Sequence, residues 1–316
     1  MKIVALAGGV GGAKFVDGLS RVIPSEDLTI IVNTGDDFNL FGLRICPDID
    51  TVCYTLAGLA NPETGWGREN ETWSALETAA SLGGPNWFHI GDRDLGLHLE
   101  RTRRMALGQP LSQIVSDFCA TWKIAPTVLP MTDEIVPTLV ETKDYGILGF
   151  QDYFVRLRCA PVVAGFKFQN IESCTPAPGV LRALQSADVV IFAPSNPWVS
   201  IGPILAVPGI SEVLRSKPVV AISPIINGKT VRGPAAKMYA ELGITPSALA
   251  VAEHYREFLS GFVLDRLDSE DAKIMARWGI IVLETDSIMS SVADRQRLAS
   301  EVTAFCRKII GGSLPA

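Results

Sequence analysis

Four short apolar runs, each followed by a glycine-rich or polar loop, constrain the fold of this chain more than any other feature. They span residues 3–7, 28–32, 188–193 and 217–222. Their length and their β-branched residues suit strands that are buried on both faces of a sheet. Because helical patterns alternate with these runs, the sequence predicts an α/β fold with a mostly parallel sheet. Ligands of such sheets bind beyond the carboxyl ends of the strands, so we expect the functional site in these loops.

The stretch of residues 33–51, directly after the second run, carries four aspartates: Asp36, Asp37, Asp48 and Asp50. Carboxylates clustered at the end of a strand are natural ligands of a hard cation such as Mg²⁺. Asp36, Asp48 and Asp50 are therefore candidates for holding the metal or for orienting a substrate hydroxyl. The alternative is a solvated acidic turn in which Asp36 caps a short helix and Asp50 caps the next one.

Residues 8–14 read Gly-Gly-Val-Gly-Gly-Ala-Lys and lie between the first run and a helical pattern. Glycines at such a place let the backbone approach a phosphate closely, and the N-terminus of the helix favours an anion. The loop departs from the dinucleotide fingerprint, because Lys14 replaces a third small residue and Asn33 replaces the acidic residue that holds the ribose. It is not a Walker loop either, because of Ala13 and Phe15. We expect a phosphate cradle with Lys14 as its counter-charge; the alternative is a tight turn whose glycines serve packing only.

Length and composition limit the classes of protein to which the chain can belong. With 316 residues, of which 47% are hydrophobic, it is long enough for one large α/β domain with an insertion. The formal net charge of −6 offers no basic face for nucleic acid, so any bound nucleotide is a small molecule. The six cysteines form no C-x-x-C pair, and neither a signal-peptide pattern nor a membrane-spanning apolar run is present. We expect a reducing, cytoplasmic location and no membrane partner.

The segment of residues 52–125 reads as a mainly helical insertion between strands of the sheet. Helical patterns cover residues 51–59, 71–82, 95–107 and 111–123. Such an insertion can serve as a cap over the ligand cleft.

Extended structure is expected again after this insertion. Residues 137–142 and 146–150 read as a hairpin, and residues 162–168 as a further strand. The last strand, at residues 279–283, and the helix at residues 292–309 look purely architectural.

A short strand is expected at residues 87–90, and it ends in the charged turn Asp92-Arg93-Asp94, which opens the next helix. Arg93 is a candidate for binding a diphosphate. The aspartates could instead cap the helix, with Arg93 paired to a neighbour. His89, beside this turn, is a candidate ligand or proton carrier, although a lone histidine near a strand commonly has a structural role. The other two histidines of the chain are interpreted as structural.

The loops after the third and fourth apolar runs carry further polar side chains. After the third run, Ser195 and Asn196 can hydrogen-bond a phosphate or a base, and Ser200 is placed to cap the following helix. After the fourth run, Lys229 and Arg232 precede another helix.

As a set, five of these motifs closely resemble those of the 2-phospho-L-lactate transferase family. They are residues 8–14, 33–37, 46–51, 91–95 and 195–203. The resemblance covers nearly the whole chain, from residue 2 to at least residues 253–255. It implies a Rossmann-like three-layer sandwich, usually dimeric.

The resemblance also implies a reaction, in which members of this family make the deazaflavin coenzyme F-420. They transfer a 2-phospholactyl or phosphoenolpyruvyl group from a guanosine diphosphate derivative to the ribityl hydroxyl of 7,8-didemethyl-8-hydroxy-5-deazariboflavin, with Mg²⁺ and release of GMP. By the same resemblance, Asp50 and His89 face the deazaflavin. The loops at residues 195–200 and 227–232 face the nucleotide.

These residues define the expected site. The expected catalytic residues are Asp36, Asp50 and Arg93, and the expected metal ligands are Asp36, Asp48 and Asp50. Substrate contacts are expected from Gly9, Gly11, Gly12, Lys14, Asn33, Asp37, Asp50, His89, Asp92, Arg93, Ser195, Asn196, Ser200, Lys229 and Arg232. Because no Ser-His-Asp set or activated cysteine is evident, we expect direct displacement between two bound substrates rather than a covalent enzyme intermediate.

Two other functions remain open at this point. The first is a regulatory protein that binds nucleotide sugars, as in a related gluconeogenesis or cell-wall factor group with the same glycine-rich start. The second is an NAD oxidoreductase, which Lys14 and Asn33 disfavour. The complete acidic stretch and the Gly-Asp-Arg-Asp turn favour the transferase.

Overall fold

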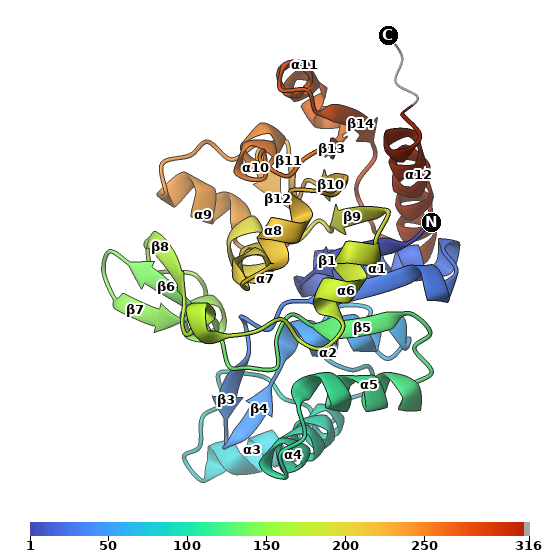
Figure 1. The fold of residues 1–316 in the computed structure, drawn as a ribbon. Helices are drawn as coiled ribbons and strands as arrows, with labels where there is room; N and C mark the ends of the chain where they lie inside the picture. The colour runs from blue at the N-terminus through green and yellow to red at the C-terminus, as the bar shows by residue number, and fades with distance from the viewer. Residues whose placement is uncertain (313–316) are drawn as a thin grey trace.

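The computed structural model describes residues 1–312 and contains a central sheet of seven parallel strands (Figure 1). In spatial order the strands are β14 (Ile281–Thr285), β13 (Gly261–Asp265), β10 (Val219–Ile222), β9 (Val189–Phe192), β1 (Ile3–Ala7), β2 (Leu28–Val32) and β5 (Thr127–Pro130). Every neighbouring pair is parallel. The four apolar runs form β10, β9, β1 and β2, which lie side by side in the middle of the sheet. The predicted α/β fold is confirmed.

Helices cover both faces of this sheet, because successive side chains of a strand point to opposite faces. In β1, Ile3 and Ala5 belong to one hydrophobic cluster, and Val4 and Leu6 belong to the other. The first cluster includes side chains of α1 (Gly9–Val22), α2 (Pro47–Leu56), α5 (Leu111–Thr121) and α12 (Val292–Ile310). The second includes side chains of α6 (Val180–Ser186), α7 (Gly202–Ala206), α8 (Ile210–Leu214), α9 (Ala235–Glu241), α10 (Ala248–His254) and α11 (Ser269–Arg277). The molecule is therefore a three-layer sandwich.

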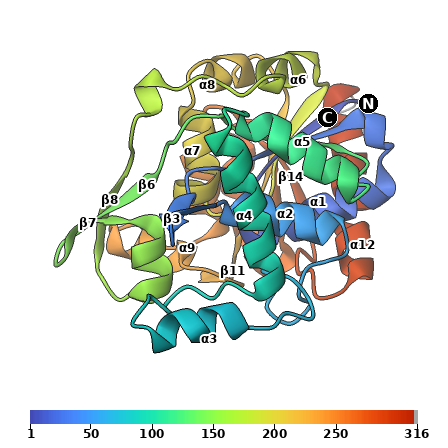
Figure 2. The same ribbon diagram turned by 90° about the horizontal axis from the view of Figure 1, so that it is seen from below.

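The segment between β2 and β5 holds a hairpin and four helices (Figure 2). In chain order these are β3 (Phe38–Leu40), β4 (Leu43–Ile45), α2, α3 (Ser74–Ser81), α4 (Asp92–Ala106) and α5. Helix α2 begins at Pro47 with Cys46 as its N-cap residue, because proline is favoured in the first turn of a helix. Asp50 therefore lies inside the helix, and the alternative in which it caps the helix is wrong.

No helix in the described part of the chain is long and apolar enough to span a membrane.

The short strand expected at residues 87–90 is absent. These residues pair with no strand among residues 1–312, and their aromatic rings pack on the β3–β4 hairpin instead. The ring centroid of Phe38 lies 5.9 Å from that of Trp87 and 4.8 Å from that of Phe88. Side-chain packing rather than a backbone ladder therefore holds this segment, and α4 starts directly after it.

A second sheet of three antiparallel strands lies at one end of the molecule (Figure 1). Its order is β7 (Gly146–Gly149), β6 (Thr138–Thr142) and β8 (Val163–Phe168), which confirms the predicted hairpin and the further strand. A single π-helical turn, η2 (Asp152–Arg156), follows β7. The remaining short elements are η1 (Ser25–Asp27), η3 (Ile171–Ser173), η4 (Pro197–Ile201), β11 (Ile225–Ile226), β12 (Lys229–Thr230) and η5 (Arg266–Asp268).

Candidate active site

A cavity of about 760 Å³ lies at the carboxyl ends of the central strands. Residues that follow β1, β2, β9, β10 and β14 all contribute to its wall. Tyr54 and His89 reach it from the segment between β2 and β5, and Phe150 and Gln151 reach it from the region around η2. Its position is the one expected for the ligand of an open parallel sheet, and its size suits a small molecule.

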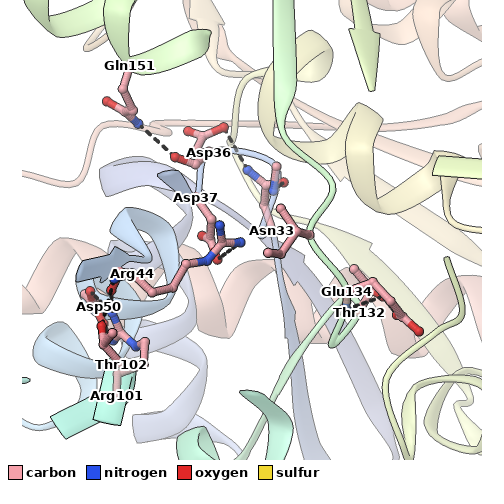
Figure 3. Close-up of polar contacts among 12 residues, drawn as sticks. Asn33, Asp36, Asp37, Arg44, Asp50, Arg101, Thr102, Thr132, Glu134 and Gln151 are labelled. Atoms are coloured by element: carbon pink, nitrogen blue, oxygen red, sulfur yellow. Dashed lines mark hydrogen bonds and ion pairs between the residues drawn. The ribbon is translucent and has the colours of Figure 1, made fainter. Parts of the chain in front are cut away.

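Asn33, at the end of β2, organises the acidic stretch. Its Nδ2 lies 3.1 Å from Asp36 Oδ1, 2.9 Å from Asp48 Oδ2 and 3.1 Å from the carbonyl oxygen of Val199, and it donates hydrogen bonds to them (Figure 3 shows Asn33 and Asp36). Its Oδ1 accepts from the N–H of Gly35 at 2.8 Å. Asn33 is fully buried and does not line the cavity. It therefore positions the carboxylates rather than facing a ligand.

Asp36 and Asp48 form an acidic pair in the cavity wall. Burial raises the pKa of the Asp48 carboxyl to about 6, although hydrogen bonds from Asn33 and Gly9 act in the opposite direction. Burial and the neighbouring Asp48 carboxylate raise the pKa of Asp36 well above its usual range. Neither residue forms an ion pair with a cationic side chain within residues 1–312. Two adjacent buried carboxylates of this kind fit a divalent cation, which would stabilise both in their charged form.

Asp37 points away from this pair. Its Oδ2 accepts from Arg44 Nη2 at 3.2 Å, and both side chains are buried (Figure 3). Burial raises the pKa of Asp37 to about 6, and the Arg44 charge counteracts this effect. Asp37 does not line the cavity, so its place in the structure is that of a buried ion-pair partner.

Asp50 belongs to a different buried network. Arg101 donates to both of its carboxylate oxygens, with Nη1 at 3.1 Å from Oδ2 (Figure 3). His98 Nδ1 lies 3.7 Å from Asp50, and His98 Nε2 lies 3.5 Å from Asp94. The hydroxyl of Tyr54 donates to Asp94 at 2.6 Å. Burial raises the pKa of Asp50, and the charges of Arg101 and His98 oppose this shift.

This network contains the one group of three candidate metal ligands in the described part of the chain. Ligand atoms of Asp50, Asp94 and His98 lie within 4.8 Å of one another. The set of Asp36, Asp48 and Asp50, expected from the sequence, does not form such a group. Because the charge of Arg101 already balances Asp50, a second cation is less favourable here than beside the Asp36–Asp48 pair.

The glycine-rich loop opens α1, but packing explains two of its glycines. A Cβ atom on Gly11 would lie 2.5 Å from the carbonyl oxygen of Pro194, and one on Gly12 would lie 2.5 Å from Ser195 Oγ. Gly12 does not line the cavity. Gly9 does, has a φ of 64°, and donates its N–H to Asp48 Oδ1 at 2.7 Å. The loop thus combines close packing with an open face at the N-terminus of α1.

Two of the expected cations lie in the cavity wall. Lys14 Nζ donates to the carbonyl oxygen of Met289 at 2.9 Å. Burial lowers the pKa of Lys14, and the charges of Arg295 and Arg232 lower it further. Arg232 also lines the cavity, whereas Lys229, on β12, is exposed outside it.

The loop after β9 lines the cavity through all three expected residues, Ser195, Asn196 and Ser200. Ser195 Oγ donates to the carbonyl oxygen of Gly8 at 2.8 Å, which ties this loop to the glycine-rich loop. Ser200 does not cap a helix, contrary to expectation. The capping residue is Asn196, whose side chain accepts from the N–H of Trp198 at 2.9 Å at the start of η4.

The charged turn before α4 lies mostly outside the cavity wall. Asp92 accepts from Thr72 Oγ1 at 2.6 Å and from the N–H of Ala75 at 3.0 Å, so it holds the first turn of α3. The alternative in which Asp92 or Asp94 caps α4 is therefore wrong: Gly91 is the N-cap residue of α4, and the Glu71 side chain accepts hydrogen bonds from the N–H groups of Arg93 and Asp94. The Arg93 side chain is exposed and does not line the cavity. His89 does line it, with its ring 5.6 Å from that of Trp73 in an edge-on arrangement.

Several wall residues were missed in the sequence. Asp94 and His98 line the cavity, and Arg101 lies buried behind it against Asp50. The three residues follow the spacing that places side chains on one face of a helix, and this period could have identified them together. Residues 287–289 follow the last strand, which was expected to be purely architectural. Because ligands bind beyond the carboxyl ends of parallel strands, their position could have identified them. Arg158 lies after η2, where no motif marks it.

The chain is similar to known proteins over most of its length. The family model described as 2-phospho-L-lactate transferase CofD matches residues 3–302. A relative from Streptomyces griseus named phosphoenolpyruvate transferase is 45% identical, and the match covers 96% of this chain and 100% of the relative. Relatives with the same name from Thermobifida fusca and Mycolicibacterium smegmatis are 46% and 43% identical, covering 85% and 81% of this chain and 88% and 83% of the relatives.

The fold is also found among solved structures. A crystal structure of a UPF0052 family member from Bacillus halodurans matches with a TM-score of 0.64 and 16% identity, covering 96% of this chain and 98% of the other. At this level of identity the likeness concerns the fold alone, and it agrees with the three-layer arrangement described above.

Proposed function

This chain belongs to the 2-phospho-L-lactate transferase CofD family, and we propose that it transfers a phosphoenolpyruvyl or 2-phospholactyl group from a guanosine diphosphate derivative to the ribityl hydroxyl of 7,8-didemethyl-8-hydroxy-5-deazariboflavin. Membership of this family makes the chain a transferase that moves a phosphate-linked group in coenzyme F-420 biosynthesis. One observation carries the finer proposal. A buried acidic pair, a glycine-rich helix start and aromatic side chains meet in a single cavity.

The proposed metal ligands are Asp36 and Asp48, which would hold Mg²⁺. Their support is the chemistry of the pair: two buried carboxylates with raised pKa values, joined by the amide of Asn33 and not paired with any cationic side chain within residues 1–312. Mg²⁺ prefers oxygen ligands, which favours this pair over the group that contains His98. When bound, the ion neutralises charge on the diphosphate of the donor.

The donor is proposed to bind along the N-terminus of α1 and the loop after β9. Lys14 and Arg232 line this part of the cavity and are close enough for the Arg232 charge to affect Lys14. Ser195, Asn196 and the N–H groups at the helix start offer hydrogen bonds to phosphate oxygens. We assign to Lys14 and Arg232 the task of stabilising the departing GMP, a task that the exposed Arg93 is not placed to share.

The acceptor is proposed to bind against the segment between β2 and β5. Its ribityl hydroxyl attacks the phosphorus that carries the three-carbon acid, and the bond from this phosphorus to the GMP oxygen breaks. Asp50 accepts a hydrogen bond from the hydroxyl, in an orientation that Arg101 and His98 fix. Trp66 and His89 line the cavity and offer flat surfaces for the deazaflavin ring.

The remaining expectations complete the proposal. The mainly helical segment at about 52–125 caps the acceptor end of the cleft. The enzyme acts as a homodimer, as members of the family usually do, in the cytoplasm. The free cysteines of the described chain are compatible with that reducing compartment.

Binding of the two substrates tests this proposal. The deazaflavin precursor should change its fluorescence on binding, and GDP in the presence of Mg²⁺ should bind at the same time. Asp50→Asn should weaken the binding of the precursor, whereas the control Asp117→Asn, on the exposed side of α5, should not. A wild-type protein that binds GDP or a nucleotide sugar but no precursor would instead support the nucleotide-binding regulator.

A further inference from the structure

Arg158 differs from the other two cationic side chains of the cavity wall. Lys14 donates to the carbonyl oxygen of Met289 at 2.9 Å, and Arg232 donates to that of Glu63 at 3.2 Å. Arg158 lines the same cavity, is exposed, and forms no hydrogen bond or ion pair with any side chain or backbone group among residues 1–312. The N–H donors of its guanidinium group are therefore available to a ligand.

The backbone at Arg158 adopts an uncommon conformation. Its φ is 50°, and that of the next residue, Cys159, is 57°. Two consecutive non-glycine residues in the left-handed region are unfavourable, and glycine would remove the steric conflict. Strain of this kind persists where the surrounding structure determines the conformation, and it clusters at ligand-binding sites. The conformation points to a role for the side chain that glycine would not serve.

Two backbone hydrogen bonds to η2 fix the turn of residues 157–159. The N–H of Leu157 donates to the carbonyl oxygen of Asp152 at 2.8 Å, and the N–H of Cys159 donates to that of Tyr153 at 2.9 Å. Tyr153 is fully buried in a hydrophobic cluster with neighbours from the second sheet. Arg158 therefore projects from a turn that is hydrogen-bonded to a packed element rather than from a loose loop.

The wall that carries Arg158 is joined to the acidic pair. Gln151 Nε2 donates to the backbone oxygen of Asp36 at 3.4 Å (Figure 3). Phe150 and Phe154 line the cavity next to Gln151. Lys14 and Arg232, the other two cationic side chains of the wall, lie close enough together for the Arg232 charge to lower the pKa of Lys14, and Arg158 is not among the charges that act on Lys14. The cavity thus offers two separate positive regions to a ligand.

We propose that Arg158 binds the carboxylate of the three-carbon acid in the donor and so selects donors that carry a carboxylate. This inference rests on the proposed function, because it assigns a partner to one charged group of that donor. A guanidinium group binds a carboxylate through two parallel hydrogen bonds, which an ammonium group cannot reproduce. Lys14 and Arg232 bind the diphosphate, so the diphosphate and the carboxylate of the donor are bound by different cationic side chains.

The test compares three variants of the full-length protein. Arg158→Gln removes the charge, Arg158→Gly also relieves the backbone conformation, and Arg156→Gln is the control. Arg156 lies two residues away, pairs with Asp152 at 2.9 Å and does not line the cavity. Each variant is assayed with the carboxylate donor, with a donor whose carboxylate is converted to an amide, and by calorimetry with GDP and Mg²⁺.

The expected result is specific to the carboxylate. Arg158→Gln and Arg158→Gly should raise the KM for the carboxylate donor about 10- to 100-fold, the range for losing hydrogen bonds to a charged group. The Kd for GDP should stay within about twofold, and the amide donor should not distinguish these variants from the wild type. Arg158→Gly should keep or raise the thermal midpoint, which separates ligand binding from folding.

Three outcomes would overturn the inference: an unchanged KM in Arg158→Gln, an equal loss of GDP affinity, or the same rise in Arg156→Gln. Failure of the proposed function is distinguishable from these. In that case the wild-type protein itself would yield no product from the carboxylate donor.

Discussion

Asn33 donates a hydrogen bond from Nδ2 to Asp48 Oδ2 at 2.9 Å; Asp48 lies in the cavity wall, and Asn33 is buried behind it. The same amide group reaches Asp36, so one neutral side chain fixes the two carboxylates that we assign to the metal. An aspartate at position 33 would add a third negative charge at this point. The identity of Asn33 is therefore set by the acidic pair rather than by a bound ribose.

The first prediction concerns this amide. Asn33→Ala should lower the free energy of unfolding by about 1–3 kcal/mol, because buried carboxylates lose a donor. It should also weaken Mg²⁺ binding, since the two ligands are no longer held together. Urea unfolding and calorimetry with Mg²⁺ measure the two effects. Asn39→Ala, on the exposed face of β3, is the control and should change neither. Full metal affinity in Asn33→Ala would contradict the assignment.

The second prediction links the metal to pH. Burial raises the pKa of Asp48 to about 6 and that of Asp36 well above its usual range. The folded metal-free protein therefore binds protons that the unfolded chain has released above about pH 4, so its stability falls as the pH rises through about 6. Mg²⁺ replaces these protons and should raise the thermal midpoint strongly at pH 7.5 and little at pH 5. An equal shift at both values, or the same profile in Asp36→Asn/Asp48→Asn, would count against the site.

The third prediction distinguishes Asp50 from that pair. Asp50→Asn should lower turnover by orders of magnitude and, because it leaves Arg101 buried without its partner, should destabilise the protein by about 3–5 kcal/mol. Arg101→Met should also be destabilising, and the double variant should recover part of the loss. Thermal unfolding of the three variants completes the cycle. Strictly additive losses would show that the two residues do not act as a pair.

The fourth prediction concerns the glycine-rich loop. Gly11→Ala places a Cβ atom 2.5 Å from the carbonyl oxygen of Pro194. It should therefore destabilise the protein by about 1–3 kcal/mol and weaken the binding of both substrates. At Gly96, on the exposed face of α4, a Cβ atom has no neighbour within 4 Å, so Gly96→Ala should be neutral or stabilising. Chemical denaturation and substrate titrations check both variants. If Gly11→Ala lost donor binding alone and its stability were unchanged, the result would support Gly11 as a phosphate contact instead.

The architecture could be predicted because strands that are buried on both faces of a sheet can be recognised from their sequence alone. The runs that became β1, β2, β9 and β10 are continuous and apolar, and the position of a ligand beyond their ends follows from parallel pairing. The prediction of a strand at residues 87–90 was wrong because it relied on the same signal. An apolar, aromatic run resembles a strand when its packing partner is unknown. That partner, the β3–β4 hairpin, lies far away in the sequence.

Much of the site could be predicted from the segments that follow the strands. Lys14, Asp36, Asp48 and Ser195 lie in the loops or the first helical turns after β1, β2, β4 and β9, and all four line the cavity. Which carboxylates face each other depends on tertiary contacts. Asp37 turns to Arg44 and Asp50 turns to Arg101, and both arginines lie outside the motifs.

The catalysed reaction is the most direct test of the central claim. The protein is incubated with Mg²⁺, the deazaflavin precursor and each guanylylated three-carbon acid in turn, and the products are weighed by mass spectrometry. We predict a deazaflavin that carries the acid through a phosphodiester, one GMP for each product molecule, loss of the reaction in EDTA, and no phosphorylated protein when the acceptor is omitted. A protein adduct formed without acceptor would contradict direct transfer, and no product from any donor would contradict the assigned reaction itself.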